Sequence, residues 1–280
     1  MEWRVTVLCE NTVPVPGLIG EHGFAALIES PNGTILFDTG QGFGLIANAN
    51  RLKKDLKQVD KLVLSHGHFD HTGGLLAFLG VHGPVPIIAH QDVLLERFRL
   101  MPIGPTEKQV SIGIPWNESY VTTRGAIFQF TSEFSEVIPG AYVTGEVPRV
   151  TDFETGDPKF SIKQNGDFVP DPFRDDYSLV LKSSKGLIVI LGCAHAGLIN
   201  ILKYATEKTG VNKVYAVLGG THLGFSAEEQ LTETIKALKA EFEVDILAVS
   251  HCTGQRPIAR LAAEFKEKFD FAPVSYTLEV

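Results

Sequence analysis

Five apolar runs that each end at an ionisable side chain are the feature of this sequence that most constrains its fold. The runs span residues 34–40, 61–68, 186–197, 213–224 and 244–254. Continuous Val, Ile and Leu stretches of this length are typical of strands buried on both faces, with helices packed outside. The side chains that end the runs are Asp38, a cluster beginning at His66, His195, His222 and His251. Because loops converge at the carboxyl ends of strands in α/β sheets, we expect these side chains to share one site.

The rest of the chain fits a single domain, which we predict to span residues 1–280. The first 37 residues have the pattern of antiparallel hairpin strands, because a Pro-Asn-Gly turn joins two of the apolar segments. Helical periodicity predicts helices after three of the runs, at 198–208, 226–240 and 256–269. Residues 97–176 are less periodic and richer in Pro, Gly and aromatics. We therefore expect an insertion at 97–176 that walls a substrate pocket.

Composition excludes several classes of protein. The net charge is −8 and no run of Lys or Arg exceeds the pair Lys53–Lys54, which argues against binding of nucleic acid. The three cysteines are far apart and odd in number, so no disulfide framework is indicated. The N-terminus lacks the features of a signal peptide, and no apolar run is long enough to span a membrane. We expect a cytoplasmic enzyme with a small-molecule substrate.

Residues 66–71, His-Gly-His-Phe-Asp-His, concentrate metal-binding groups. The chain has nine histidines, and three of them stand within these six positions. Residues two apart in an extended segment point the same way, so the imidazoles of His66 and His68 can reach one cation. Asp70 and His71, at the predicted start of a helix, can face a second cation. Imidazole and carboxylate together suit Zn²⁺, and also Fe or Mn. The competing interpretation is a polar loop that caps a helix.

Each of the two cations then lacks one protein ligand, and His195 and His251 at later strand ends are the candidates to complete the sets. The motif H-x-H-x-D-H, with Asp38, His195 and His251 in order around it, resembles the metallo-β-lactamase superfamily. That resemblance implies an αββα sandwich, in which two mixed sheets pack face to face with helices outside, and a dinuclear site. The first metal would take His66, His68 and His195, and the second would take Asp70, His71 and His251. Asp38 would fix the ligand loop by hydrogen bonds.

One position departs from the superfamily pattern. Many members carry a bridging Asp at a strand end that falls near Gly219-Gly220-Thr221 here, and this chain has no carboxylate there. A narrower resemblance comes from "EHGFAALIES", "IPGAYVTGEVPR", "DDYSLVLKSSKGLIVILGCAHAG" and "VLGGTHL". These segments look like the 7,8-dihydropterin-6-methyl-4-(β-D-ribofuranosyl)aminobenzene-5′-phosphate synthase-like branch, which is associated with a dihydropterin-related transferase.

Several other residues are candidates for roles at the site. Asp70 and His222 are the predicted catalytic residues, with His222 contacting substrate or donating a proton. The alternative for His222 is a packed or capping histidine. Substrate contacts are predicted for His22, Glu146 and Arg149; a surface histidine and a loop salt bridge are the competing interpretations.

Three further sets of side chains are interpreted as structural. Cys193 and Cys252 flank ligand histidines, and packing is favoured over a metal thiolate. The pair at 175–176 is expected to cap or turn the chain before a strand. His82 and His90 are not expected to be ligands.

The predicted function is that of a metal-dependent enzyme with two divalent cations, zinc or else iron or manganese. Two cations about 3.5–4 Å apart can activate a bridging water or clamp phosphate oxygens. A hydrolase or a dihydropterin-related transferase acting on a small phosphorylated or pterin-like substrate follows from this. The alternatives are a hydrolase of phosphodiesters, lactones or thioesters, and a catalytically silent module that binds metal or ligand.

Overall fold

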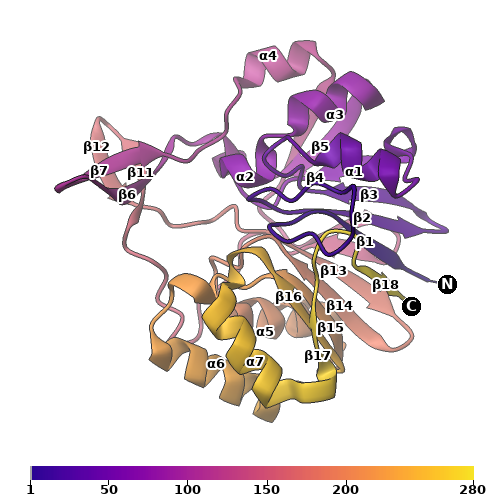
Figure 1. Ribbon diagram of the computed structural model, residues 1–280, viewed down its shortest axis with the longest axis vertical. Helices are drawn as coiled ribbons and strands as arrows, with labels where there is room; N and C mark the ends of the chain where they lie inside the picture. The colour runs from indigo at the N-terminus through magenta and orange to yellow at the C-terminus, as the bar shows by residue number, and fades with distance from the viewer. Residues whose placement is uncertain (1) are drawn as a thin grey trace.

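A computed structural model describes residues 2–280, and the body of the molecule is a pair of sheets packed face to face (Figure 1). In spatial order, the first sheet contains β18 (Thr277–Glu279), β1 (Arg4–Cys9), β2 (Ala25–Ser30), β3 (Gly33–Phe37), β4 (Lys61–Val63), β5 (Val85–Ala89) and β8 (Ala126–Phe130). The second contains β17 (Phe269–Phe271), β16 (Ile246–Ser250), β15 (Val214–Gly220), β14 (Gly186–Leu191), β13 (Ser178–Ser183), β10 (Ala141–Val143) and β9 (Ser135–Ile138).

Helices cover the outer face of each sheet. On the first sheet these are α1 (Leu45–Arg51), α2 (Phe69–Thr72), α3 (Leu75–His82) and α4 (Glu118–Thr123). On the second sheet they are α5 (Leu198–Thr209), α6 (Glu228–Glu241) and α7 (Gln255–Phe265). The predicted αββα sandwich is confirmed, and the three predicted helices correspond to α5, α6 and α7 to within a few residues at their ends.

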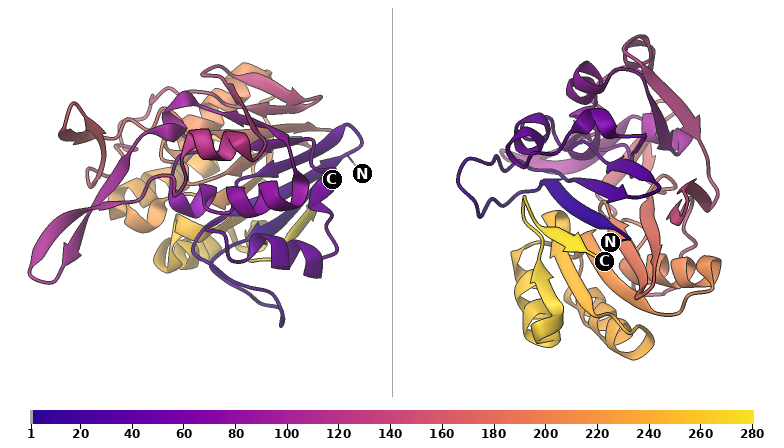
Figure 2. Two further views of the ribbon diagram at one scale, coloured as in Figure 1. Left: turned by 90° about the horizontal axis from the view of Figure 1, so that it is seen from above. Right: turned by 90° about the vertical axis from the view of Figure 1, so that its right-hand side faces the viewer.

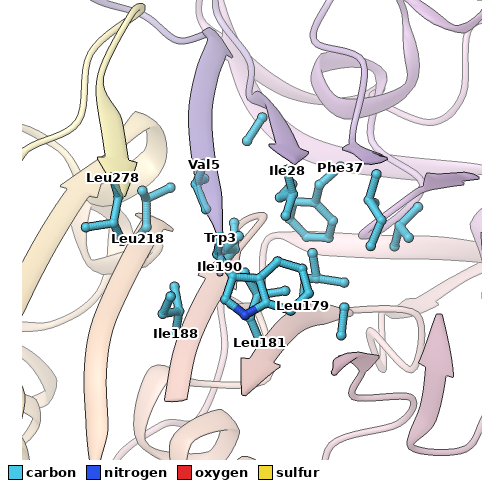
Figure 3. Packing of buried hydrophobic residues seen from close by; sticks show 14 of the residues in the cluster. Trp3, Val5, Ile28, Phe37, Leu179, Leu181, Ile188, Ile190, Leu218 and Leu278 are labelled. Carbon is cyan, nitrogen blue, oxygen red and sulfur yellow. The ribbon is translucent and has the colours of Figure 1, made fainter. Parts of the chain in front are cut away.

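The core between the sheets explains why the strand segments are apolar without interruption. In β2, Ile28 points into the layer between the sheets, whereas its neighbour Leu27 packs against the helices on the other face. Figure 3 shows Ile28 and Phe37 of the first sheet facing Leu179 and Ile190 of the second. Each such side chain contributes about 1.5–3 kcal/mol when it leaves water, so a strand buried on both faces needs apolar residues at every position.

The segment 97–176 is divided among three sheets. Its strands β8, β9 and β10 belong to the two main sheets. The remaining four, β6 (Arg97–Ile103), β7 (Thr106–Ser111), β11 (Phe160–Gln164) and β12 (Asp167–Pro170), form a separate antiparallel sheet. This small sheet projects from the body of the molecule, as Figure 1 and the left-hand view of Figure 2 show. The insertion proper is therefore shorter than the sequence analysis expected and is interrupted by core strands.

Strand directions bring the ends of the apolar runs together. The N-terminal strands pair antiparallel, β1 with β2 and β2 with β3, as predicted from the Pro-Asn-Gly turn. In contrast, β3, β4 and β5 are mutually parallel, and so are β14, β15 and β16. Parallel strands have their carboxyl ends at one edge, so each sheet delivers several polar loops to the same edge of the sandwich.

Among residues 2–280, the structure has no helix that is long and apolar enough to cross a membrane.

Candidate metal centre

Three parts of the chain supply the six predicted ligands. His66 follows strand β4, and His68, Asp70 and His71 lie at or in α2. His195 follows β14, and His251 follows β16 at the start of a short 3₁₀ turn. All six residues are at most 7 % exposed, so their polar atoms are removed from bulk water. The structure brings these segments together at one edge of the sandwich.

His66, His68 and His195 form the first group. Each offers a ligand atom that lies within 4.8 Å of the other two. The Nε2 of His66 lies 2.9 Å from the Nδ1 of His68. The Nε2 atoms of His68 and His195 are buried and have no hydrogen-bond partner among the described residues. Buried polar atoms are nearly always paired, so unpaired imidazole nitrogens in a histidine cluster fit a bound cation.

Asp70, His71 and His251 form the second group. The Nε2 atoms of His71 and His251 are 3.2 Å apart. Asp70 Oδ2 lies 3.4 Å from the Nε2 of His251 and 3.8 Å from the Nε2 of His71. Two imidazole nitrogens and a carboxylate oxygen at such separations could all bind one cation. The donor set suits zinc, iron or manganese, so the residues present fit the two metals that the sequence predicts.

Hydrogen bonds to the opposite ring nitrogens hold these imidazoles in place. Asp38 Oδ2 lies 2.7 Å from Nδ1 of His71, and Asp38 also accepts hydrogen bonds from the backbone N–H and the hydroxyl of Ser65. The hydroxyl of Ser65 lies 2.9 Å from Nδ1 of His66. Asn11 Oδ1 lies 3.0 Å from Nδ1 of His251. A partner on Nδ1 fixes the tautomer and leaves Nε2 facing the centre.

The loops that carry the ligands are anchored by buried carboxylates. Asp175 accepts a hydrogen bond from the backbone N–H of Gly67, and Asp176 accepts one from that of Ala196. Both residues are 1 % exposed, because the turn before β13 passes beneath the ligand loops instead of over the surface. Asp175 also pairs with the buried guanidinium of Arg97. The two aspartates therefore hold the loops that carry the ligands. The sequence analysis expects only a cap or a turn at 175–176 and does not predict this role.

Burial keeps most of the imidazoles neutral. It lowers the pKa of His66, His68 and His195 well below the usual value, and neighbouring positive groups lower it further. Burial also lowers the pKa of His251 to about 4, although a hydrogen bond that its ring donates to the carboxylate of Asp70 acts in the opposite direction. Neutral imidazoles present a free lone pair, which is the form that binds metal.

His71 and Asp70 behave differently because they lie close to opposite charges. Burial alone would lower the pKa of His71, but the carboxylates of Asp38 and Asp70 raise it to about 9. Burial opposes ionisation of Asp70, yet His71 and the hydrogen bonds of His22 and His251 hold its pKa well below the usual value. The opposite charges around them thus favour the charged forms of both Asp70 and His71.

The backbone around the site is strained. Asp38, Ala194, His222 and His251 all have φ between 51° and 60°, in the left-handed region that residues other than glycine rarely adopt. Each stands just beyond the end of a strand that carries the site. Such conformations cost about 1–3 kcal/mol each and persist where the surroundings fix them, commonly at functional sites.

A cavity of about 390 Å³ lies over the ligands. Its floor includes His68, Asp70, Cys193, His195 and His251. Its walls are mostly apolar and include Met101, Val110, Ile112, Phe160 and Phe225, together with Arg99. The hairpin β6–β7, within the segment 97–176, supplies several of these residues.

The other predicted site residues divide between the cavity and elsewhere. His222 lines the cavity, with its ring centroid 4.3 Å from that of His195. His22 stands at the rim, with its side chain 55 % exposed and its Nε2 3.2 Å from Asp70 Oδ2. Glu146 does not line the cavity; it lies 3.1 Å from Nε2 of His90. Arg149 does not line it either, and donates to the carbonyl oxygen of His195.

Two polar cavity residues, Arg99 and Cys193, are not assigned to the site by the sequence analysis. Arg99 lies in an aperiodic segment, and nothing in the sequence distinguishes it from other surface arginines. For Cys193 the sequence favours packing over metal binding, whereas in the structure its Sγ lies 3.2 Å from Nε2 of His71. The remaining histidines, His82 and His90, lie outside the cluster, where Nε2 of His82 contacts the carbonyl oxygen of Val59 and Nε2 of His90 contacts the carboxylate of Glu146.

Comparisons with known proteins agree with this geometry. The family model of the Metallo-beta-lactamase superfamily matches residues 18–156. A protein of Methanocaldococcus jannaschii named 7,8-dihydropterin-6-methyl-4-(beta-D-ribofuranosyl)-aminobenzene-5'-phosphate synthase is 33% identical over 262 residues, which cover 89% of this chain and 87% of that protein. An uncharacterized protein of the same organism is 30% identical, over 92% of this chain and 93% of the relative.

A solved structure agrees as well. Tm1679, described as a metal-dependent hydrolase of the beta-lactamase superfamily, matches with a TM-score of 0.84 and 29% identity, over 100% of this chain and 99% of that one. The sequence relatives, the shared fold and the histidine-rich site lead to one conclusion. This chain belongs to the metallo-beta-lactamase superfamily.

Proposed function

We propose that this chain is a dinuclear metal-dependent enzyme that acts on a small substrate carrying a planar ring and a phosphate. The observation that carries the proposal is the convergence of six buried donor groups beneath a mostly apolar cavity. In this proposal, one cation is held by His66, His68 and His195. The other is held by Asp70, His71 and His251.

The bound cations would supply the Lewis acidity that activates water or neutralises phosphate oxygens. The chain's own residues do the rest. His222 lines the cavity beside His195 and contacts the substrate, where it can donate or accept a proton. His22 stands at the rim, hydrogen-bonded to Asp70, and contacts the substrate as it enters. Asp70 has two roles in the proposal, as a cation ligand and as the carboxylate that orients His22.

Arg99 is the group best placed to bind a substrate phosphate. Its guanidinium carbon lies 5.0 Å from the ring centroid of Phe160 and 4.5 Å from that of Phe225. Its Nε is buried without a hydrogen-bond partner among the described residues, so a donor is available. A planar guanidinium matches phosphate oxygens, and the two phenyl rings offer faces and edges to a planar ring. Arg99 thus replaces Glu146 and Arg149 as the proposed anion contact.

Transfer is the reaction that the sequence relatives favour. The relative from Methanocaldococcus jannaschii is named as a synthase of a dihydropterin joined to a ribosyl aminobenzene phosphate, and it matches over most of both chains. A pterin ring and a phosphate are the two features that Phe160, Phe225 and Arg99 would recognise. We therefore propose a dihydropterin-related transferase.

Hydrolysis is the second candidate. The solved structure with a TM-score of 0.84 carries the description of a metal-dependent hydrolase. The same donor groups would serve a phosphodiester, lactone or thioester hydrolase, since activation of water needs no further residue.

The experiment is a paired assay of the zinc-loaded protein. One arm offers a dihydropterin pyrophosphate with a ribosyl aminobenzene phosphate, and the other offers bis(p-nitrophenyl) phosphate, homoserine lactones and thioesters. The proposal expects turnover in the first arm and a KM for the phosphorylated substrate that rises in Arg99→Ala but not in the exposed control Arg124→Ala. Turnover only in the second arm would establish the hydrolase, and tight pterin binding without any turnover would overturn both enzyme proposals.

A further inference from the structure

We propose that Cys193 is itself a metal ligand and supplies a thiolate between the two cations. The inference rests on the proposed dinuclear centre and adds to it a seventh, sulfur donor. It also answers the question raised by the missing bridging carboxylate. The argument follows from three observations about the strand ends of the second sheet.

At the strand end where the superfamily pattern would place an Asp, the two glycines have no room for a side chain, and the hydroxyl of the next residue, Thr221, is bonded to that of Thr253. A Cβ on Gly220 would lie 2.7 Å from Sγ of Cys252, and the carbonyl oxygen of Gly192 is nearer still. Gly219 has φ of +113°, and a Cβ there would collide with the backbone of Leu191. The end of β15 is therefore pressed against the end of β14, and no group from Gly219 or Gly220 can reach the centre.

Close packing puts the end of β14 against the ligand loop. A Cβ on Gly192 would lie 2.6 Å from Cβ of Ser65 and 3.3 Å from Oδ2 of Asp38. Ser65 and Asp38 contact the imidazoles of His66 and His71. The residue after Gly192 is therefore placed next to these two histidines. That residue is Cys193, which is 3 % exposed and belongs to the cavity floor.

The sulfur of Cys193 lies among the donors of both groups. It is 3.2 Å from Nε2 of His71. The ligand atoms of His66, His71 and Cys193 all lie within 4.8 Å of one another, and so do those of Cys193, His251 and Cys252. Cys193 therefore neighbours His66 from the first group and both His71 and His251 from the second. A donor in this position could bind either cation or bridge the pair.

An independent sign of a ligand comes from the histidines. The Nε2 atoms of His68 and His195 are buried and unpaired in the described chain, and both belong to the group that includes His66. Cys252, the neighbouring residue, is placed as a neutral thiol, because its Sγ donates a hydrogen bond to the carbonyl oxygen of Cys193, 3.7 Å away. Among residues 2–280, the Sγ of Cys193 donates to no backbone carbonyl and instead lies beside Nε2 of His71, so Cys193 is the thiol that we assign to the metals.

Metal binding would change the chemistry of this side chain. A coordinated thiol loses its proton and becomes a thiolate, a soft ligand that favours zinc, cobalt and iron over magnesium or manganese. A mixed nitrogen, oxygen and sulfur centre should therefore select the softer cations. The released proton passes to solvent, and no oxidant is required.

Cobalt substitution tests the assignment without an activity assay. Cobalt-loaded wild-type protein should show the near-ultraviolet charge-transfer band of a thiolate bound to cobalt. The band should disappear in Cys193→Ser and persist in the control variants Cys252→Ser and Cys9→Ser, whose thiols are equally buried. Cobalt affinity should fall by more than the roughly 10–100-fold typical of losing an outer hydrogen-bond partner.

X-ray absorption of the zinc-loaded wild type covers the case in which Cys193→Ser does not fold. A zinc–sulfur shell at about 2.3 Å, retained in Cys252→Ser, would support the assignment. Wild-type protein that binds zinc or cobalt with only nitrogen and oxygen neighbours would overturn it while leaving the proposed centre intact. Wild-type protein that binds no metal at all would overturn the proposed centre as well.

Discussion

Asp38 Oδ2 lies 2.7 Å from Nδ1 of His71, and neither side chain has any exposed surface. The pair joins the end of β3 to the helix α2, so it links the first sheet to the residues that would bind the second cation. Asp38 also accepts hydrogen bonds from Ser65, which in turn contacts His66. One carboxylate thus orients an imidazole from each of the two ligand groups.

Replacing Asp38 tests this role. Asp38→Asn should keep the fold, because Asn tolerates the left-handed backbone conformation at this position, with φ of 60°. Its amide accepts hydrogen bonds less strongly than a carboxylate, so zinc affinity should fall by about 10–100-fold. Chelator competition measures the change. The control is Asp60→Asn, an exposed carboxylate that accepts from the backbone of Thr34; equal zinc affinity in both variants would contradict the role of Asp38.

The buried Arg97 predicts a large effect on stability. Its guanidinium pairs with Asp171 and Asp175, and all three side chains are at most 1 % exposed. Arg97→Met leaves two carboxylates without their partner, which should cost about 3–5 kcal/mol in the free energy of unfolding. Urea unfolding of the metal-free protein measures this. Arg124→Met, on the surface, should change stability by about 0.5 kcal/mol or less; a similar loss in both variants would refute the prediction.

The sequence predicts the ligands of the metal centre better than the residues that hydrogen-bond to those ligands. The motif of residues 66–71 lies within six positions, so its spacing alone indicates that the side chains can share cations. Asn11, in contrast, is 240 positions away from His251, whose ring it contacts. No local pattern reports such a contact, because it depends on how β1 and β16 are placed across the sandwich.

The layers of the fold were predictable for a similar reason. Apolar runs, turn residues and helical periodicity are local signals, and they predicted the N-terminal hairpins and α5–α7. The segment 97–176 has weaker periodicity, so its core strands β8, β9 and β10 could not be separated from the projecting sheet. Asp175 shows the same limit, since an Asp pair before a strand indicates a turn whether it lies on the surface or under the ligand loops.

His222 predicts how stability depends on pH. Burial, followed by the charge of Arg99, lowers the pKa of His222 to about 3, whereas an unfolded histidine titrates near about 6.5. Between these values the unfolded chain takes up a proton that the folded chain does not, so His222 destabilises the fold as the pH falls from 6.5 toward 3. His222→Asn should therefore gain stability relative to the wild type when the pH is lowered from 8 to 5. Urea unfolding in EDTA at both values checks this, and a difference that does not change with pH would argue against it.

Phe225 predicts a change in substrate binding without a change in metal content. Its side chain is 47 % exposed at the cavity wall and packs beneath the guanidinium of Arg99. Phe225→Ala should raise KM for a ring-containing substrate about two- to tenfold, since an aromatic contact contributes about 0.5–1.5 kcal/mol. Phe168→Ala, an equally exposed phenylalanine on β12 outside the cavity, is the control. Lower zinc content in Phe225→Ala would show that the residue acts on the metal site instead.

The metal content of the purified protein tests the central claim most directly. Elemental analysis after zinc loading and desalting should give two zinc ions per chain for the wild type. His68→Ala and His251→Ala, which remove one ligand from each group, should each lose at least one of them. Unchanged zinc content in both variants would contradict the account, because the six converging side chains would then not be what holds the metal.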